Sequence, residues 1–213
     1  MTDTKQKILD TAARLIAEQG YAATSLRHII AEAGVNLAAI HYHFGSKEEL
    51  LDEIVRQGAG PVNAERLARL DQAEREAAPA APPVERVLEA LLIPLAEAAD
   101  RIPLFVPFMG RMLSEGLTLT IAARHFEEIS LRLTAALRRA NPALSAEEFA
   151  WRVHFMSGAI AHTMCGTPHF PQLGGMECDF RTRIGLLITF LSAGFCAPDT
   201  PPASSNQGAR KDQ

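Results

Sequence analysis

A short stretch near the start of the chain carries side chains suited to contacting DNA. If residues 36–43 form a helix, Ala38, His41 and Tyr42 project from one side, with Ala39 on the flank. Alanine lets a helix approach the floor of the major groove, where its methyl group can meet that of thymine. Histidine and tyrosine offer hydrogen bonds to phosphates or base edges. We therefore predict that this face enters a DNA groove.

The residues just before this stretch offer further contacts. Arg27 lies in the first turn of an expected helix and has the reach to contact guanine. Thr24 and Ser25 precede it and can hold a phosphate at the helix N-terminus, where the helix dipole attracts anions. Residues 20–47 contain two basic residues and one acidic residue. This local balance permits DNA binding, although a helical hairpin with an inert surface has the same spacing.

The elements that must position these residues follow from helical periodicity and from helix-ending residues. A first helix ends at Gly20, and Asn36 is placed to cap the short helix of the DNA-facing stretch. Ser46 caps the next helix, in which Glu49 completes a capping box. That helix is expected to run to about Glu76 as a connector to the rest of the chain.

The remainder of the chain also has helical periodicity. Residues 77–83 (AAPAAPP) form a linker, because proline interrupts helices. Further helices are expected over 84–100, 104–115, 117–140, 145–165 and 179–196. The sequence thus predicts an all-α chain of about nine helices. We divide it into a domain that carries the DNA-facing stretch (1–52), a larger helical domain (53–196) and a disordered tail (197–213).

Composition limits the class of protein. The chain has 213 residues, 47% of them hydrophobic, which is enough to bury a core without disulfides. A formal net charge of -4 excludes a protein that coats nucleic acid with a basic surface all around it. Three cysteines without close pairs suit a reducing compartment. The charged start does not resemble a signal peptide, and the uncharged stretches suit buried helices better than membrane spans. We expect a cytoplasmic protein that does not enter the membrane.

The run Thr24–Leu51, TSLRHIIAEAGVNLAAIHYHFGSKEELL, resembles the helix-turn-helix of the TetR family of bacterial repressors. It shares a Thr-capped second helix, a Gly-Val turn, an aromatic end to the recognition helix and a Ser-Lys-acidic start to the fourth helix. His41 departs from the tyrosine that this family usually has. Together, the resemblance and the capping positions give these predicted DNA-binding residues: Thr24, Ser25, Arg27, Asn36, Leu37, Ala38, Ala39, His41, Tyr42, His43 and Lys47.

The same resemblance implies a homodimer that reads a palindromic operator in double-stranded DNA. It implies a repressor that needs no cofactor and releases the operator when a small apolar effector binds. Segments 62–70 and 147–164 resemble the PsrA-like, fatty-acid-responsive branch of the family. That second resemblance suggests a fatty acid or an acyl-CoA ester as the effector.

The helix expected over residues 145–165 is apolar on all sides, which is typical of a helix buried by its own core and by a partner subunit. Its Gly158 permits close approach of another helix. With the helix over residues 179–196, we expect it to form a four-helix dimer interface. The predicted interface residues are Met156, Ile160, Met164, Ile188 and Leu191.

Large, adaptable side chains in the second half of the chain could line an effector pocket, although the same spacing fits an ordinary core. Arg111 lies in an apolar run, where it either pairs with Glu115 or receives a ligand carboxylate. The predicted effector-binding residues are Phe105, Phe108, Met109, Arg111, Met112, Phe126, Trp151 and Phe155.

Two other classes of protein fit the sequence less well. An all-α enzyme lacks support, because no catalytic arrangement falls in a recognisable motif, and His154 and His162 lack a third metal ligand. A protein-interaction adaptor without DNA binding is disfavoured by the intact groove-facing residues and by Lys47. A DNA-binding repressor that is not an enzyme fits the sequence best.

Overall fold

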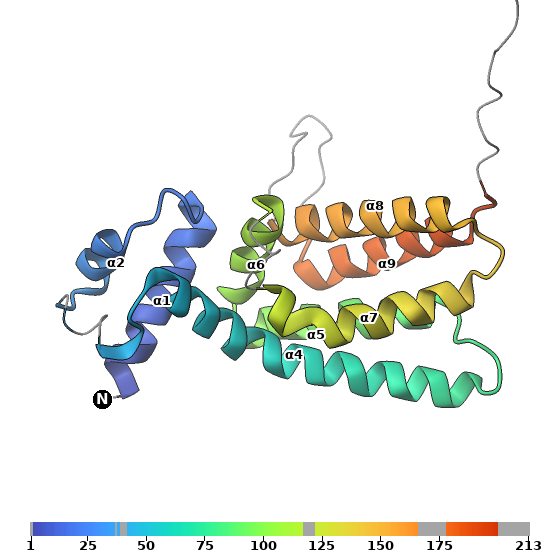
Figure 1. Ribbon diagram of the computed structural model, residues 1–213, viewed down its shortest axis with the longest axis horizontal. Coiled ribbons are helices and arrows are strands. Elements are labelled where there is room, and N and C mark those ends of the chain that lie inside the picture. Colours follow the sequence, from blue (N-terminus) through green and yellow to red (C-terminus); the bar gives the residue numbers. More distant parts are fainter. Residues whose placement is uncertain (1, 37, 39–41, 117–121, 166–177, 200–213) are drawn as a thin grey trace, which may run out of the picture.

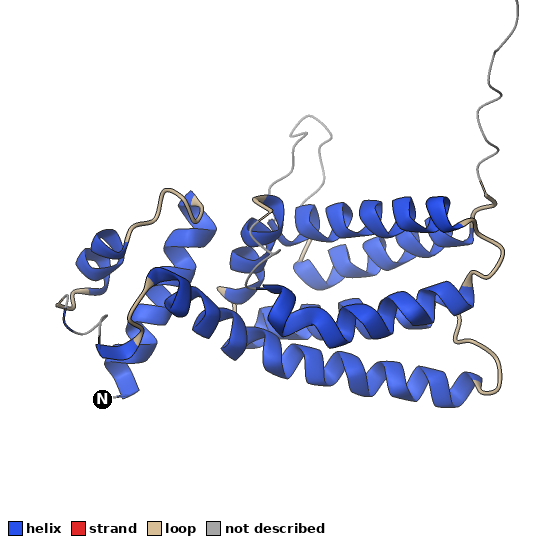
Figure 2. Cartoon of the chain, in the orientation of Figure 1, coloured by secondary structure: helices blue, strands red, loops and turns tan. Residues whose placement is uncertain are grey.

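The computed structural model describes residues 2–36, 38, 42–116, 122–165 and 178–199, and every element in these ranges is an α-helix (Figure 2). In chain order they are α1 (Thr2–Gln19), α2 (Leu26–Ala33), α4 (Lys47–Ala77), α5 (Val84–Arg101), α6 (Phe105–Ser114), α7 (Ala122–Ala140), α8 (Ala146–Cys165) and α9 (Phe180–Cys196). The predicted all-α class is confirmed. The short helix expected over residues 36–43 falls mostly outside the described residues. No helix in the described ranges is long and apolar enough to cross a membrane.

The helices α1 and α2 pack with the start of α4 into an N-terminal unit (Figure 1). Gly20 (φ 89°) follows α1 and Gly34 (φ 60°) follows α2, in a backbone region that glycine enters without steric strain. The apolar faces meet in a core in which Ile8, Leu15 and Ile29 are almost completely buried. The glycine turns and this core together place the N-terminus of α2 at the surface of the unit.

The helix α4 joins the N-terminal unit to the rest of the molecule (Figure 1). It begins with the capping box expected from the sequence: Glu49 N–H donates to Ser46 Oγ, and Ser46 N–H donates to Glu49 Oε2, each at 3.1 Å. The helix continues through Pro61 and ends at Ala77. One continuous element therefore runs from the N-terminal unit along the C-terminal helices.

The remaining helices form a bundle in which α5 packs against α4 and α9, and α8 lies beside α9 (Figure 1). The helix α6 contacts both α1 and α8 at the end of the bundle. It approaches α8 closely because Gly110 has no side chain. A Cβ there would come within 2.8 Å of backbone atoms of Met164 and Cys165. As a result, α6 is packed between the N-terminal unit and α8.

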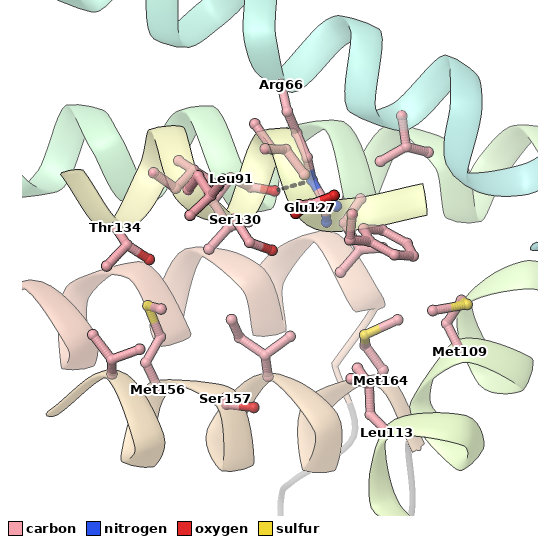
Figure 3. A pocket seen from close by; sticks show the side chains of 18 of the residues that line it. Arg66, Leu91, Met109, Leu113, Glu127, Ser130, Thr134, Met156, Ser157 and Met164 are labelled. Atoms are coloured by element: carbon pink, nitrogen blue, oxygen red, sulfur yellow. Dashed lines mark hydrogen bonds between the residues drawn. The ribbon is translucent and has the colours of Figure 1, made fainter. Parts of the chain in front are cut away.

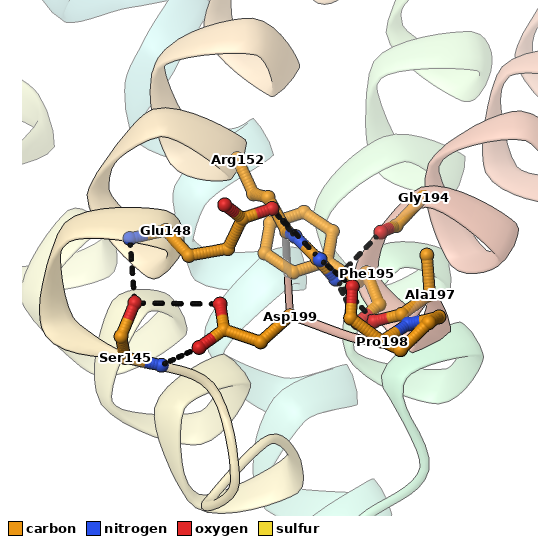
Figure 4. Close-up of polar contacts among 8 residues, drawn as sticks. All are labelled: Ser145, Glu148, Arg152, Gly194, Phe195, Ala197, Pro198 and Asp199. Atoms are coloured by element: carbon orange, nitrogen blue, oxygen red, sulfur yellow. Dashed lines mark hydrogen bonds and ion pairs between the residues drawn. The ribbon is translucent and has the colours of Figure 1, made fainter. Parts of the chain in front are cut away.

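A buried arginine fixes the end of α9 to α8 (Figure 4). Arg152 pairs with Glu148 at 2.9 Å. It also donates at 2.7–3.0 Å to carbonyl groups at the end of α9, those of Gly194, Phe195, Ala197 and Pro198. Such carbonyls lack partners within their own helix. The expectation of a disordered tail from residue 197 is therefore wrong for residues 197–199, and residues 200–213 lie outside the described part.

Candidate nucleic-acid interface and effector cavity

The N-terminus of α2 is suited to accept an anion. Ser25 caps the helix, and its Oγ accepts a hydrogen bond from His28 N–H at 3.1 Å. The first turn contains no acidic residue, and Arg27 is exposed there. The unpaired N–H groups of a first turn and the helix dipole both favour a negative group. This helix end can therefore take up a DNA phosphate with Arg27 beside it.

Exposed side chains continue from α2 toward α4. Tyr42 is 73% exposed, and its ring lies edge-on to that of His43 with 5.0 Å between centroids. Asn36 and Ala38 are also exposed, whereas His43 is half-buried. The sequence predicts that a DNA groove meets this surface. Three predicted contact residues lie outside the described residues: Leu37, Ala39 and His41.

Thr24 does not present its side chain to this surface. It is fully buried, its Oγ1 donates to the Gly20 carbonyl at 2.8 Å, and its N–H donates to the Tyr21 carbonyl at 3.2 Å. The prediction that the Thr24 hydroxyl binds phosphate is therefore wrong for this conformation. The hydroxyl instead closes the turn between α1 and α2.

Lys47 is also directed toward the protein. Its Nζ donates to the Tyr21 carbonyl at 2.5 Å and lies 3.7 Å from the centre of the Tyr21 ring. Burial lowers the pKa of this ammonium group. In this conformation Lys47 supports the turn between α1 and α2. Its predicted phosphate contact requires exchange of this hydrogen bond for one to DNA.

The same turn is held from the C-terminal bundle. Tyr21 N–H donates to Glu115 Oε2 at 3.1 Å, and Glu115 Oε1 pairs with Arg111 Nε at 2.7 Å. The Tyr21 hydroxyl donates to Glu48 at 3.2 Å, and burial raises the pKa of this phenol. We name Tyr21, Lys47, Glu48, Arg111 and Glu115 the Tyr21 clasp. It connects the turn before α2 to the start of α4 and the end of α6.

A cavity of about 700 Å³ lies among α4, α5, α6, α7 and α8 (Figure 3). This volume is within the range of roughly 300–1,000 Å³ that is usual for small-molecule sites. The lining is mostly apolar and includes three predicted effector-binding residues, Phe105, Met109 and Phe126. Glu127 and Leu131 of α7 also line it and are exposed, so the cavity opens to solvent beside α7.

A second apolar surface lies on the outside of α8 and α9. We name it the α8–α9 apolar face and define it by four side chains that are each more than half exposed: Trp151, Phe155, Leu186 and Phe190. The rings of Trp151 and Phe155 stack with 5.8 Å between centroids. Large contiguous apolar patches are rare on soluble monomers and mark contact surfaces.

Two family models match this chain. The model described as "Bacterial regulatory proteins, tetR family" matches residues 8–54, and "Tetracyclin repressor-like, C-terminal domain" matches residues 87–194. The second match alone spans half of the chain. The protein belongs to the TetR family. It is therefore a DNA-binding transcriptional regulator.

Individual relatives match mainly over the DNA-binding region. The chain is 48% identical over 52 residues to the HTH-type transcriptional regulator AcrR of Shigella flexneri, which is 24% of each protein. It is 30% identical over 135 residues to the HTH-type transcriptional regulator BetI of Rhizobium meliloti, which is 63% of this chain and 59% of BetI. The chain thus matches about a quarter of AcrR and less than two thirds of BetI.

Solved structures of TetR-type regulators share the whole fold. The fatty acid degradation regulator FadR from Bacillus halodurans has a TM-score of 0.61 at 17% identity, covering 90% of this chain and 95% of that one. A TetR family regulator from Marinobacter aquaeolei VT8 also has a TM-score of 0.61, at 19% identity, covering 90% and 94%. At such identities the likeness shows the fold alone.

Five predicted effector-binding residues of this TetR-family protein do not line the cavity. Phe108 and Met112 are almost completely buried in the core and do not line the cavity. The remaining three are Arg111, which belongs to the Tyr21 clasp, and Trp151 and Phe155, which lie on the α8–α9 apolar face. For Arg111 the expected alternative, the pair with Glu115, is the one observed.

The predicted dimer-interface residues are directed inward. Met156, Ile160 and Met164 line the cavity, and Ile188 and Leu191 are buried within the subunit. The sequence predicted that these side chains form the dimer interface, but in this subunit they pack inward. Because α8 and α9 are apolar on all sides, the sequence did not distinguish the inward side from the outward one.

Most of the residues that line the cavity were missed by sequence reasoning, and one of them is a buried arginine. Arg66 on α4 is buried and lines the cavity (Figure 3). A signal was available, because Arg66 follows Val62 and precedes Leu70 at helical spacing, in a stripe that is otherwise buried and apolar. A charged residue in such a stripe indicates either a buried pair or a site.

Proposed function

We propose that this TetR-family protein is a homodimeric repressor that binds a palindromic operator and releases it when a small apolar effector enters the cavity. The observation that carries this proposal is that α6 belongs to both sites. Phe105 and Met109 of α6 line the cavity, and Glu115, one residue beyond the helix, holds the Tyr21 turn. A ligand that shifts α6 therefore acts on the support of α2.

The α8–α9 apolar face supports the dimer. A two-fold axis through this face would bring together the same patch on both subunits, which is the usual form of a symmetric dimer. Each subunit then presents one α2 and its following residues to one half-site. Half-sites of such dimers lie about 34–36 Å apart, one turn of DNA.

Release requires that the effector bind better to the form that does not fit DNA. Two elements connect the cavity to the DNA-binding unit: α4, which is continuous, and α6, which acts through the Tyr21 clasp. A small displacement of α4 or α6 changes the distance between the DNA-contacting surfaces of the two subunits. By linkage, DNA must weaken effector binding by the same factor, typically about 5–150-fold.

The effector is an apolar molecule in this proposal, since the cavity lining is mostly apolar. The resemblance to the PsrA-like branch supports a fatty acid or an acyl-CoA ester. The solved neighbour described as a fatty acid degradation regulator is in line with this choice, although it shares the fold alone.

A gel-shift titration on DNA from upstream of the protein's own gene tests the proposal. We expect sequence-specific binding that weakens steeply with salt, because phosphate contacts release counterions. Adding apolar acids, thioesters or aromatic compounds, one at a time, should identify a ligand that both raises the melting temperature and releases the DNA. A ligand that raises the melting temperature but leaves operator affinity unchanged contradicts the release mechanism.

A further inference from the structure

Arg66 is a buried cation beside a mostly apolar cavity. It projects from α4 toward the cavity (Figure 3) and is only 7% exposed. Its Nε donates to the Leu91 carbonyl at 2.9 Å, and its Nη1 donates to Asn63 Oδ1 at 3.0 Å. Both acceptors are neutral. Among the described residues, Nη2 donates to no acceptor.

No carboxylate in the described part of the chain balances this charge. Burial is the sole cause that lowers the pKa of Arg66, to about 10, so the guanidinium stays protonated at neutral pH. Glu127 lines the same cavity from α7, but it is exposed and forms no ion pair with Arg66. A buried charge without a counter-charge is costly, and a ligand that supplies one gains from that cost.

We propose that the effector is an amphipathic acid, whose single carboxylate is bound by Arg66 and whose apolar body extends between α6 and α8. This inference rests on the proposed effector role of the cavity. The guanidinium has donors left on Nη1 and Nη2, and its planar group matches the two oxygens of a carboxylate. The methionines at positions 109, 156 and 164 give a lining that adapts to an apolar body. A free acid fits better than its thioester, whose carbonyl carries no charge.

The other arginines near the cavity are less suited to this role. Arg111 does not line the cavity and is paired with Glu115 at 2.7 Å. Arg124 lines the cavity but is exposed, so water screens its charge. Burial therefore distinguishes Arg66 as the anchor.

Ligand binding by the full-length wild-type protein gives the first test, with no DNA present. Decanoate, decan-1-ol and decyltrimethylammonium have similar apolar chains and differ in the charge of the head group. Calorimetric titration and thermal melts should show decanoate binding roughly 10- to 100-fold more tightly than decan-1-ol, as expected for hydrogen bonds to a charged group. Equal or tighter binding of the alcohol or of the cation overturns the proposal.

Substitutions locate the anchor. In Arg66→Met, decanoate affinity should fall to that of decan-1-ol while decan-1-ol affinity is unchanged. Arg111→Met and Arg124→Met are matched controls and should keep the preference for decanoate. Glu127→Gln should bind decanoate more tightly, because it removes a like charge from the cavity. The assignment is overturned if Arg66→Met still prefers decanoate over decan-1-ol, or if only Arg124→Met loses this preference. If Arg66→Met does not fold, the comparison of the three ligands on the wild-type protein decides.

Gel shifts separate this inference from the proposed function. If decan-1-ol binds and releases the operator as well as decanoate, the repressor proposal stands and the Arg66 inference fails. If decanoate binds through Arg66 without weakening operator binding, the inference stands and the release mechanism fails.

Discussion

At the scale of single residues, exposure separates side chains that can contact DNA from those that support the contact surface. Tyr42 and Arg27 are exposed, whereas Thr24 is fully buried and Lys47 is bonded to the Tyr21 carbonyl. All four residues were predicted from one motif to touch DNA. In this conformation Thr24 and Lys47 instead stabilise the turn that positions α2.

Tyr42→Ala tests the exposed part of this surface. Because Tyr42 is 73% exposed, we expect the melting temperature to stay within about 2 °C of wild type, as is usual for surface substitutions. Operator affinity should fall by about 1–3 kcal/mol. Tyr42→Phe serves as the control that keeps the ring and removes the hydroxyl. Unchanged affinity in Tyr42→Ala, measured by gel shift, would remove Tyr42 from the interface.

Glu53 makes the N-terminal unit sensitive to acid. Hydrogen bonds from Arg56, and then from Lys5 at 2.8 Å, lower the pKa of this carboxylate from 4.5 to about 2. The stability that it contributes is present above pH 4.5 and is lost as the pH falls toward 2. Glu53→Gln should therefore melt below wild type at neutral pH, and the difference should shrink on acidification. A difference that is constant across this window contradicts the assignment.

At the scale of elements, the helices were more predictable than the directions of their faces. Helix ends depend on local signals, such as the Ser46–Glu49 capping box and Gly34, and the structure has them where the sequence places them. The faces of α8 and α9 depend on tertiary packing. Trp151 and Met156 are both apolar, but one is exposed and the other lines the cavity, and periodicity does not separate them.

The sequence predicted the helix α6, but it did not predict that α6 lines the cavity or that Glu115, next to its end, holds the Tyr21 turn. The clasp bond between Glu115 and Tyr21 joins residues 94 positions apart, which no local pattern reveals. The buried stripe on α4 marks Arg66 as unusual, but its contacts with Leu91 and with the cavity are remote in sequence. Long-range contacts of this kind are the part of the site that required the structure.

Glu115→Ala tests whether α6 carries the signal. Removing this carboxylate breaks the clasp bond to Tyr21 N–H and the pair with Arg111. We expect the effector to release the operator less well, so that the coupling factor, normally about 5–150-fold, moves toward one. Glu89→Ala is a matched control, because it removes a pair with Arg86 on α5, away from the DNA-binding unit. Equal coupling in both variants would assign the signal to α4 alone.

The contact between α6 and α8 allows a stability test with an internal control. Gly110→Ala places a Cβ within 2.8 Å of backbone atoms of α8, which cannot move as a side chain does. Overpacking of this kind costs about 1–3 kcal/mol of unfolding free energy. Gly60→Ala on α4 meets nothing within 4 Å and should gain up to about 1 kcal/mol from helix propensity. Urea unfolding of both variants measures the difference, and equal stabilities contradict the close packing of α6 on α8.

At the scale of the whole molecule, the two sides of α8 face different surroundings. Its inward side, with Met156 and Met164, lines the cavity, while its outward side carries Trp151 and Phe155. In the proposed repressor, one helix therefore contacts both the effector and the partner subunit. An effector that shifts α8 can alter the relation between subunits as well as the position of α6.

The last prediction concerns this assembly. Phe190 is 70% exposed on α9 and belongs to the α8–α9 apolar face, so Phe190→Glu places a charge at the proposed two-fold contact without disturbing the core of the subunit. We expect sedimentation at micromolar concentration to show a dimer for wild type and a monomer for the variant. The far-ultraviolet circular dichroism should be unchanged. Operator affinity should fall sharply, because a monomer reads only one half-site.

Leu131→Glu is the matched control, since Leu131 is 66% exposed on α7, outside this face, and the variant should stay dimeric. A wild-type monomer, or a Phe190→Glu dimer of wild-type stability, would place the subunit contact elsewhere on the molecule.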